Sequence, residues 1–328
     1  IAEAGVNHNG ELASALGLVD AAAHAGANVV KFQTFSADRL VTFTAAKAGY
    51  QVPHGRVGET QHELLSRLEL SRADHEALIA RAREHGIEFL STGFDEQSVD
   101  MLIDLGAARL KIPSGEITNL PYLRHVGGRG LPVILSTGMS DLDEVSAALR
   151  VLESSGAKRE EVTVLHCTTA YPTPSAEANL RAMATMAGEL GVRVGYSDHT
   201  MGHEIAVAAV ALGACVIEKH LTLDRTATGP DHAASLEPGE FAELVRAIRS
   251  VEQALGDGTK VAQPSEIANM VAARRSLVTV APIRAGELFS GANIAAKRPG
   301  SGLSPMRWDD VIGTPAPRDF AVDELVER

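Results

Sequence analysis

Two lysines stand at the ends of short apolar runs, Lys31 in Val30-Lys-Phe-Gln33 and Lys111 in Leu110-Lys-Ile-Pro113. Hydroxyl side chains end similar runs, namely those of Thr92, Ser114, Ser136 and Ser197. Because ammonium and hydroxyl groups donate directed hydrogen bonds to phosphate and carboxylate oxygens, the set predicts an anion-binding site. Since lysine is rarely buried unless it is paired, the alternative is that each lysine forms an ion pair with Glu3, Glu116 or Glu218.

Two histidines end consecutive apolar runs, His199 in Ser197-Asp-His-Thr200 and His220 in Glu218-Lys-His220. Two imidazoles, with the other coordination positions left to water and substrate oxygens, suit a divalent Mn²⁺, Mg²⁺ or Co²⁺ that acts as a Lewis acid. A closed structural zinc site would need more protein ligands. The alternative is that each histidine is a hydrogen-bonded core residue.

The elements that must position these side chains alternate along the chain. Runs rich in β-branched and aliphatic residues predict eight strands, at Ile1–Glu3, Asn28–Gln33, Glu88–Thr92, Arg109–Pro113, Pro132–Thr137, Glu161–Thr168, Arg193–Asp198 and Cys215–His220. Amphipathic segments between them predict helices, among them Leu12–Ala25, Arg72–His85, Gln97–Leu105, Asp141–Ser154, Leu180–Leu190, Glu204–Leu212 and Pro238–Leu255.

Strands that are apolar on both faces are typical of a parallel sheet, and eight βα units over about 250 residues predict an α/β fold, a closed (β/α)8 TIM barrel. The alternative is an open doubly wound sheet. No Gly-x-Gly-x-x-Gly follows the first run, which counts against a dinucleotide-binding sheet. In a barrel the polar residues at the strand ends would share one mouth.

The pattern changes after Gly256. Residues 1–256 are predicted to form the barrel, residues 257–273 a connector with Gly258 and Pro264, and residues 274–328 a small second domain. Its short apolar runs are Ser276–Ala281 and Asn293–Lys297. A domain this small is near the lower limit for independent folding, so we expect it to pack over a barrel mouth.

Composition excludes several classes of protein. The formal net charge of −12 and the 4% content of aromatic residues argue against nucleic-acid binding. The longest apolar stretch, Ile205–Ile217, is too short to span a membrane. No basic and apolar leader begins the chain, so a cytoplasmic location is expected. Cys167 and Cys215 lie in apolar runs, which predicts reduced core thiols.

Many motifs together carry a resemblance that runs nearly end to end. They include Ile1-Ala-Glu-Ala-Gly-Val-Asn-His-Asn-Gly10, Leu110-Lys-Ile-Pro-Ser-Gly-Glu-Ile117, Leu135-Ser-Thr-Gly-Met139, Tyr171-Pro-Thr-Pro174, Gly195-Tyr-Ser-Asp-His-Thr200, Ile217-Glu-Lys-His220, Gly229-Pro-Asp-His232 and Lys297-Arg-Pro-Gly300. The chain resembles the sialic acid synthase family, in which a (β/α)8 barrel carries a small C-terminal antifreeze-like (SAF) domain. The resemblance implies a metal-dependent transferase that condenses phosphoenolpyruvate with N-acetylmannosamine to give N-acetylneuraminate and phosphate.

Two alternatives remain open at this point. One is a legionaminic acid synthase that acts on a 2,4-diacetamido-trideoxy-mannose, and the other is a non-catalytic sugar-binding or assembly module. The segment 37–67 departs from the family pattern at Ala48-Gly-Tyr-Gln51, and we expect this loop to sense the substituents of the sugar.

The resemblance also implies roles for individual residues. Phosphoenolpyruvate would contact Lys31, Thr92, Lys111, Ser114, Ser136 and Ser197; the sugar would contact Gln33, Tyr171 and Asp231; a divalent metal, Mn²⁺ first, would bind His199 and His220. Glu3 and Glu116 would be the acid and base, with the division between them open. The family forms domain-swapped homodimers, and Arg298 matches the residue that reaches the sugar from the partner chain.

Overall fold

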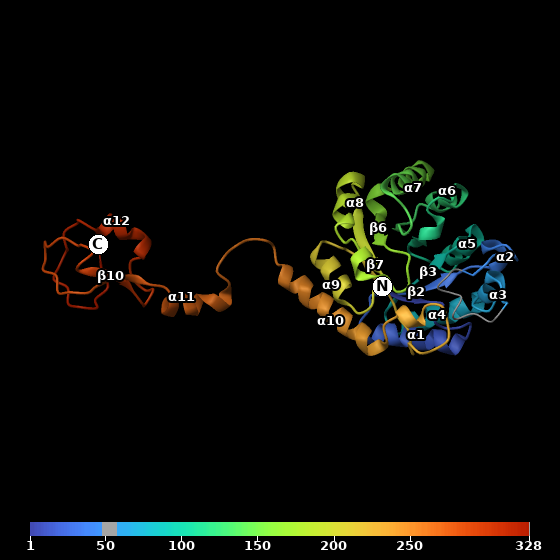
Figure 1. The fold of residues 1–328 in the computed structure, drawn as a ribbon, viewed down its shortest axis with the longest axis horizontal. Coiled ribbons are helices and arrows are strands. Elements are labelled where there is room, and N and C mark those ends of the chain that lie inside the picture. The colour runs from blue at the N-terminus through green and yellow to red at the C-terminus, as the bar shows by residue number, and fades with distance from the viewer. Residues whose placement is uncertain (48–57, 328) are drawn as a thin grey trace. The chain divides into compact units, whose positions relative to one another are not determined.

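The computed structural model describes residues 1–47 and 58–327 of the chain. The chain divides into two compact units, Ile1–Gly256 and Asp257–Arg328, and each is described by itself (Figure 1).

The first unit is a closed barrel of eight parallel strands in sequence order. The strands are β1 (Ala2–Gly5), β2 (Val29–Thr34), β3 (Glu88–Gly93), β4 (Leu110–Ile112), β5 (Val133–Ser136), β6 (Val162–Cys167), β7 (Arg193–Asp198) and β8 (Ile217–His220). Closure comes from β1 and β8, which pair through Ala2 with Lys219 and through Glu3 with His220. The predicted barrel is therefore confirmed, and the open doubly wound sheet is wrong.

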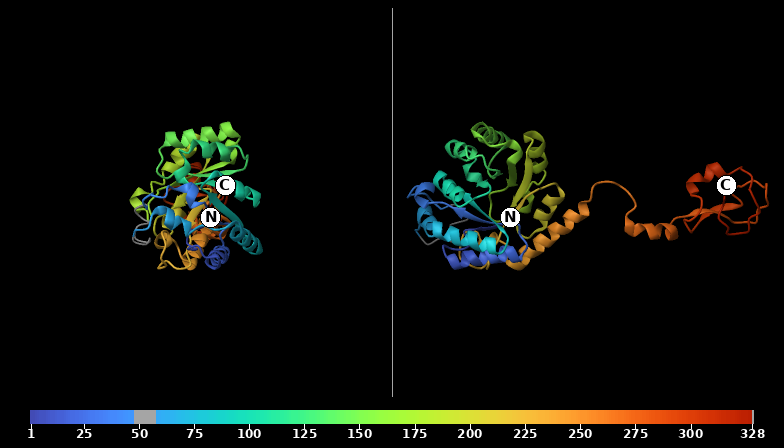
Figure 2. Two further views of the ribbon diagram at one scale, coloured as in Figure 1. Left: turned by 90° about the vertical axis from the view of Figure 1, so that its right-hand side faces the viewer. Right: turned by 180° about the vertical axis from the view of Figure 1, so that it is seen from behind.

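Helices surround the strands, as both views in Figure 2 show. They are α1 (Leu12–His24), α4 (Arg72–Glu84), α5 (Glu96–Asp104), α6 (Leu120–Gly127), α7 (Leu142–Ser155), α8 (Ala182–Leu190), α9 (Glu204–Ala211) and α10 (Pro238–Leu255). At the start of α7, Asp141 accepts a hydrogen bond from the Glu144 amide and the Glu144 carboxylate caps Asp141 in return. This capping box fixes the predicted helix start. Helix α6 was not among the helices that we predicted.

The barrel interior changes from apolar to polar along four of the strands, β2, β3, β5 and β6. At its lower level Val29, Leu90, Ile134 and Leu165 form a buried apolar cluster. Side chains on one face of a strand recur every second residue. Two positions further on, the same strands place Lys31, Thr92, Ser136 and Cys167, which are also buried. The polar side chains thus lie at the C-terminal ends of the strands, above an apolar plug.

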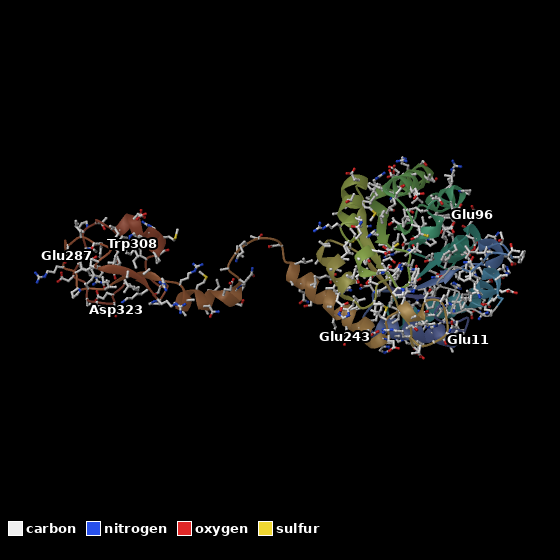
Figure 3. The ribbon with its side chains drawn as sticks, in the orientation of Figure 1. Glu11, Glu96, Glu243, Glu287, Trp308 and Asp323 are labelled. Carbon is white, nitrogen blue, oxygen red and sulfur yellow. The ribbon has the colours of Figure 1, made fainter. Side chains whose placement is uncertain are left out.

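The second unit has a core of its own. Strands β9 (Ser276–Thr279) and β10 (Ile294–Lys297) form an antiparallel pair within the two predicted apolar runs. Leu277, Phe289, Ile294 and Phe320 are buried in this core, and Trp308 of α12 (Trp308–Val311) packs against it (Figure 3). The segment predicted as a connector contains a helix, α11 (Ile267–Ala273).

The two cysteines differ in their exposure to solvent. Cys167 is buried but Cys215 is exposed, because β8 begins only at Ile217 and leaves Cys215 outside the strand. The core-thiol prediction is therefore wrong for Cys215. Among the helices that the structure describes, none is long and apolar enough to cross a membrane.

The loop that we expect to sense sugar substituents is described only in part. It contains α2 (Ala37–Leu40) and α3 (Gln61–Ser66), and α3 begins with a capping box between Thr60 and Glu63. The departure from the family pattern at residues 48–51 lies outside the described residues.

Candidate active site

The two predicted lysines lie inside the barrel, and each donates to a hydroxyl group on the next strand. Lys31 Nζ is 3.1 Å from Thr92 Oγ1, and Lys111 Nζ is 2.7 Å from Ser136 Oγ. Both lysines are buried. Four of the residues predicted to bind the anion are therefore joined in two pairs on four consecutive strands.

One buried carboxylate lies between these lysines, and a second one pairs with Lys31. Lys31 Nζ is 2.6 Å from Glu3 Oε2, and Glu218 Oε1 lies 3.6 Å from Lys31 Nζ and 3.7 Å from Lys111 Nζ. Glu218 Oε1 also accepts a hydrogen bond from Ser197 Oγ at 3.1 Å. The ion-pair alternative thus holds for Glu3 and Glu218, in the same mouth as the anion-binding groups. Glu116 is not part of it, because its carboxylate accepts from Asn119 instead.

The two buried glutamates have opposite pKa shifts. Burial raises the pKa of Glu3 to about 7, although Lys31 opposes this rise. Burial also disfavours ionisation of Glu218, but Lys111 and Lys31 outweigh it and lower the pKa of Glu218 to about 2. Glu218 is therefore ionised near neutral pH as the counter-charge between the two lysines, whereas Glu3 can exchange a proton in that range.

A cavity of about 330 Å³ opens above these groups. Ten of the predicted site residues line it: Lys31, Gln33, Thr92, Lys111, Ser114, Glu116, Ser136, Tyr171, Ser197 and His199. One side of the same cavity is apolar, with Phe35, Leu40, Val41, Leu65 and Phe94. Sequence reasoning missed this apolar wall, because most of it comes from the segment between β2 and α4, whose short helices α2 and α3 were not predicted.

The loop after β5 places a backbone donor beside Ser114. The Gly138 amide donates to Ser114 Oγ at 2.9 Å, and Ser114 Oγ lies 3.4 Å from Cys167 Sγ. A Cβ atom at Gly138 would lie 2.1 Å from Thr169 Oγ1, so only glycine fits there. Our prediction did not select Gly138 or Cys167. The Ser-Thr-Gly-Met motif after the fifth strand was the available signal for Gly138.

The two predicted metal ligands lie side by side, with ring centroids 5.6 Å apart. The Tyr171 ring lies 4.3 Å from that of His199 and 5.8 Å from that of His220. His199 Nδ1 lies 2.7 Å from the Thr168 carbonyl oxygen, so Nδ1 carries the proton and Nε2 keeps its lone pair. Burial lowers the pKa of both histidines and keeps the rings neutral, as metal ligands must be.

The histidine pair fits a divalent cation by the chemistry of its atoms. His220 Nδ1 is buried without a hydrogen-bond partner among the described residues, which a satisfied core histidine would have. The nearest acidic atom that we find is Asp231 Oδ2, at 3.9 Å. Within the described ranges, no group of three or more His, Cys, Asp or Glu side chains is arranged to hold a metal ion. A cation here would therefore need water or substrate oxygens as further ligands.

The remaining barrel residues of the predicted site gather around Gly5. Gln33 Nε2 donates to Glu3 Oε1 at 3.3 Å. A Cβ atom at Gly5 would lie 3.4 Å from both Gln33 Nε2 and Asp231 Oδ2. Both polar groups therefore lie close to the Gly5 backbone. Burial raises the pKa of Asp231 to about 6. Arg298 lies in the second unit, where it donates to the Ala273 carbonyl, and its action in a partner chain stays a prediction.

A closed (β/α)8 barrel with two buried lysines, two buried glutamates and a histidine pair at the C-terminal ends of its strands has the polar mouth that is typical of a barrel enzyme. The model of the NeuB family matches residues 18–260, and that of the SAF domain matches residues 274–327. This chain belongs to the NeuB family, whose members are sugar acid synthases that condense phosphoenolpyruvate. The resemblance to sialic acid synthases is thereby confirmed.

Individual relatives cover almost the whole chain. The N,N'-diacetyllegionaminic acid synthase of Campylobacter jejuni is 50% identical over 100% of this chain and 98% of its own length. The protein of the same name from Legionella pneumophila is 48% identical over 96% of this chain and 89% of its own. A crystal structure of the N-acetylneuraminic acid synthetase from Leptospira borgpetersenii, in complex with citrate, is 35% identical with a TM-score of 0.71, and covers 82% of this chain and 88% of that one.

Proposed function

We propose that this protein is a legionaminic acid synthase, which condenses phosphoenolpyruvate with a 2,4-diacetamido-trideoxy-mannose to give N,N'-diacetyllegionaminic acid and phosphate. The observation that carries the proposal is the full-length identity of 50% with a relative of that name. The N-acetylneuraminic acid synthetase of known structure is less similar, at 35% identity. The comparisons thus favour the second of the two sugars expected from sequence over N-acetylmannosamine.

The apolar wall of the cavity also supports this choice. Leu40, Val41 and Leu65 come from the segment that we expect to sense the sugar substituents. The diacetamido sugar carries two acetamido methyl groups and a deoxy carbon where N-acetylmannosamine carries one acetamido group and more hydroxyls. Apolar side chains favour methyl groups, because burial of each removes apolar surface from water.

In the proposed reaction the enol carbon of phosphoenolpyruvate attacks the sugar aldehyde carbon, and water adds to the carbon that bears the phosphate before the carbon–oxygen bond to phosphate breaks. Lys31 and Lys111, with their hydroxyl partners, hold the phosphate and carboxylate groups. A divalent cation held by His199 and His220, Mn²⁺ in our proposal, would supply Lewis-acid polarisation of the aldehyde.

Two carboxyl groups divide the proton transfers. We assign the activation of water to Glu116, which lines the cavity outside the lysine cluster. Glu3, with its pKa near 7, can deliver a proton at neutral pH to the alkoxide that forms on the sugar. Gln33 and Asp231, beside Glu3, orient the sugar hydroxyl groups.

The test is phosphate release from phosphoenolpyruvate and Mn²⁺ in the presence of a panel of sugars. We expect kcat/KM with the 2,4-diacetamido-trideoxy-mannose to exceed that with N-acetylmannosamine by at least about tenfold, which corresponds to about 1.4 kcal/mol of differential binding. A higher value with N-acetylmannosamine would overturn the choice of sugar. Binding of both reactants without phosphate release would support a non-catalytic binding module instead.

We propose further that the protein acts as a homodimer in which Arg298 of one chain contacts the sugar in the barrel of the other. The proposal rests on the match of Lys297-Arg-Pro-Gly300 to the family motif. In the structure Arg298 is exposed, so its guanidinium group is accessible to another chain.

A further inference from the structure

Two neighbouring cross-strand pairs between β7 and β8 lie on opposite faces of the barrel wall. In the register of these strands, Ser197 is opposite Glu218 and Asp198 is opposite Lys219. The first pair faces the mouth, where Ser197 donates to Glu218. Because successive side chains point to opposite faces, Asp198 and Lys219 point away from the barrel axis.

The outer pair is a fully buried ion pair. Lys219 Nζ lies 2.8 Å from Asp198 Oδ2, and both side chains are 0% exposed. Lys219 Nζ also donates to the Thr200 carbonyl oxygen at 2.5 Å. The other carboxylate oxygen, Asp198 Oδ1, accepts from the Thr200 amide at 2.9 Å and from Thr200 Oγ1 at 2.8 Å. The network therefore holds the backbone on both sides of His199.

Stability alone does not account for such a pair. Removing two charges from water is costly, and an apolar pair of similar volume is often at least as stable as a buried ion pair. What an apolar pair could not supply is the set of hydrogen bonds to Thr200. These bonds fix the chain that carries His199, and Lys219 itself directly precedes His220.

We propose that Asp198 and Lys219 are positioning residues that hold His199 and His220 at the spacing needed to bind one divalent cation. The inference rests on the proposed function, in which that cation takes part. Neither residue touches the substrate or the cation, because both point away from the mouth. They act through the backbone, in the way that groups outside the ligand sphere orient metal ligands and change metal affinity by about 10- to 100-fold.

The test is Mn²⁺ binding to the full-length protein, measured by electron paramagnetic resonance of free Mn²⁺. The variant is the double substitution Asp198→Asn with Lys219→Met, which removes both charges, keeps an acceptor for Thr200 and fills the space of the lysine stem. We expect the Kd for Mn²⁺ to rise about 10- to 100-fold. The melting temperature and the Kd for phosphoenolpyruvate without metal should stay close to those of the wild type.

A matched control replaces another ion pair between neighbouring strands. Arg109, which directly precedes β4, forms a two-bond ion pair with Glu88, the first residue of β3, whereas His199 and His220 lie at the C-terminal ends of their strands. The double substitution Glu88→Gln with Arg109→Met should leave the Kd for Mn²⁺ unchanged. If the Asp198/Lys219 variant does not fold, the single change Asp198→Asn should still give a smaller rise in that Kd.

Two results would overturn the proposal, and they differ in meaning. A Kd within twofold of the wild type in a folded Asp198 variant removes the positioning role and leaves the cation site in place. A wild-type protein that binds no Mn²⁺ removes the cation site as well. Neither result alters the choice of sugar, which the phosphate-release panel decides separately.

Discussion

Glu3 and Glu218 both contact Lys31, but their pKa values shift in opposite directions. Burial raises the pKa of Glu3, whereas burial of Glu218 is outweighed by Lys111 and Lys31, which together lower its pKa. In the folded protein Glu3 keeps its proton up to about pH 7, whereas an unfolded glutamate loses it near pH 4.5. Its contribution to the free energy of unfolding is therefore fully present below pH 4.5 and is lost as the pH rises through 7. For Glu3→Gln we expect the stability relative to the wild type to increase between pH 5 and pH 7.5 in urea denaturation.

Glu218 provides the control for that experiment. Its pKa is lowered to about 2, so its contribution is present above pH 4.5 and is lost only as the pH falls towards 2. The difference in stability between Glu218→Gln and the wild type should be constant from pH 5 to pH 7.5. A Glu3 variant that behaved in the same way would contradict the raised pKa of Glu3.

Lys111 should contribute mainly to the binding of phosphoenolpyruvate. It is buried and donates to Ser136, with Glu218 as its counter-charge. A hydrogen bond to a charged group contributes about 1.5–3 kcal/mol, so Lys111→Met should raise the KM for phosphoenolpyruvate by about 10- to 150-fold. The KM for the sugar should change little. Lys158→Met, at an exposed ion pair with Glu161, should have wild-type kinetics.

Gly138 should be needed for the same site without being needed for the fold. A methyl group there would collide with Thr169 Oγ1 and crowd Ser114 Oγ, at 2.1 and 3.0 Å. We expect Gly138→Ala to displace the Ser114 hydroxyl and to lower kcat/KM for phosphoenolpyruvate at least about tenfold, or about 1.4 kcal/mol. Gly239→Ala, where the new methyl group meets no atom within 4 Å, is the matched control. Equal kinetics in the two variants would rule out this role.

At the residue scale the sequence predicted the charged and imidazole groups but not their partners. Lys31, Lys111, His199 and His220 could be selected because each ends an apolar run, and parallel strands bring such ends to one mouth. The place of Glu218 between both lysines depends on side-chain direction across three strands, which a linear pattern does not give. For that reason we named Glu218 only as an alternative ion-pair partner.

At the scale of elements, the packing of α6 against α7 depends on Gly127. A Cβ atom there would lie 2.7 Å from the Leu152 carbonyl oxygen and 2.8 Å from Ser155 Cβ, so the two helices would have to move apart. Overpacking of this kind costs about 1–3 kcal/mol, and we expect Gly127→Ala to lower the free energy of unfolding by that amount. Gly188→Ala in α8 meets no atom within 4 Å and should be neutral or slightly stabilising. Thermal denaturation of both variants makes the comparison.

Elements with a strong period were predicted well and short ones were not. The strands were recognisable because burial on both faces makes them apolar throughout. Helices α2 and α11 are short, and their sequences offer too few turns for an amphipathic period to emerge. The eighth strand was begun too early because Ala214 and Val216 flank Cys215 with apolar side chains.

At the scale of the whole molecule, the proposed exchange of Arg298 between chains can be tested by complementation. Homodimers of the Arg298→Ala variant and of the His220→Ala variant should each be inactive. The first would lack its sugar contact, and the second would lack a metal ligand. In a mixed dimer the barrel with intact histidines would receive Arg298 from its partner. Random mixing after subunit exchange should restore about a quarter of the wild-type activity.

A mixture of the two variants that stays inactive would contradict the exchange of Arg298 between chains. If Arg298 served the barrel of its own chain, no combination of the two variants would contain a complete site, and the mixture would stay inactive. Size measurements on each variant and on the mixture would confirm that the chains associate.

The charge distribution differs between the outside and the inside of the barrel. Glu11, Glu96 and Glu243 stand on the exterior (Figure 3), in keeping with the net charge of −12. The net charge argues against a nucleic-acid surface but carries no information about the mouth, where Lys31 and Lys111 are buried.

The apolar plug of Val29, Leu90, Ile134 and Leu165 has a kinetic consequence. It closes the barrel below the lysines, so every reactant and product must pass through the one mouth. Lys31 and Lys111 lie above the plug, and Gln33, which we assign to the sugar, follows Lys31 by two residues towards the C-terminal end of β2. We therefore expect compulsory-order kinetics, with phosphoenolpyruvate entering first and phosphate departing last, so that phosphate is a competitive inhibitor against phosphoenolpyruvate and a noncompetitive one against the sugar.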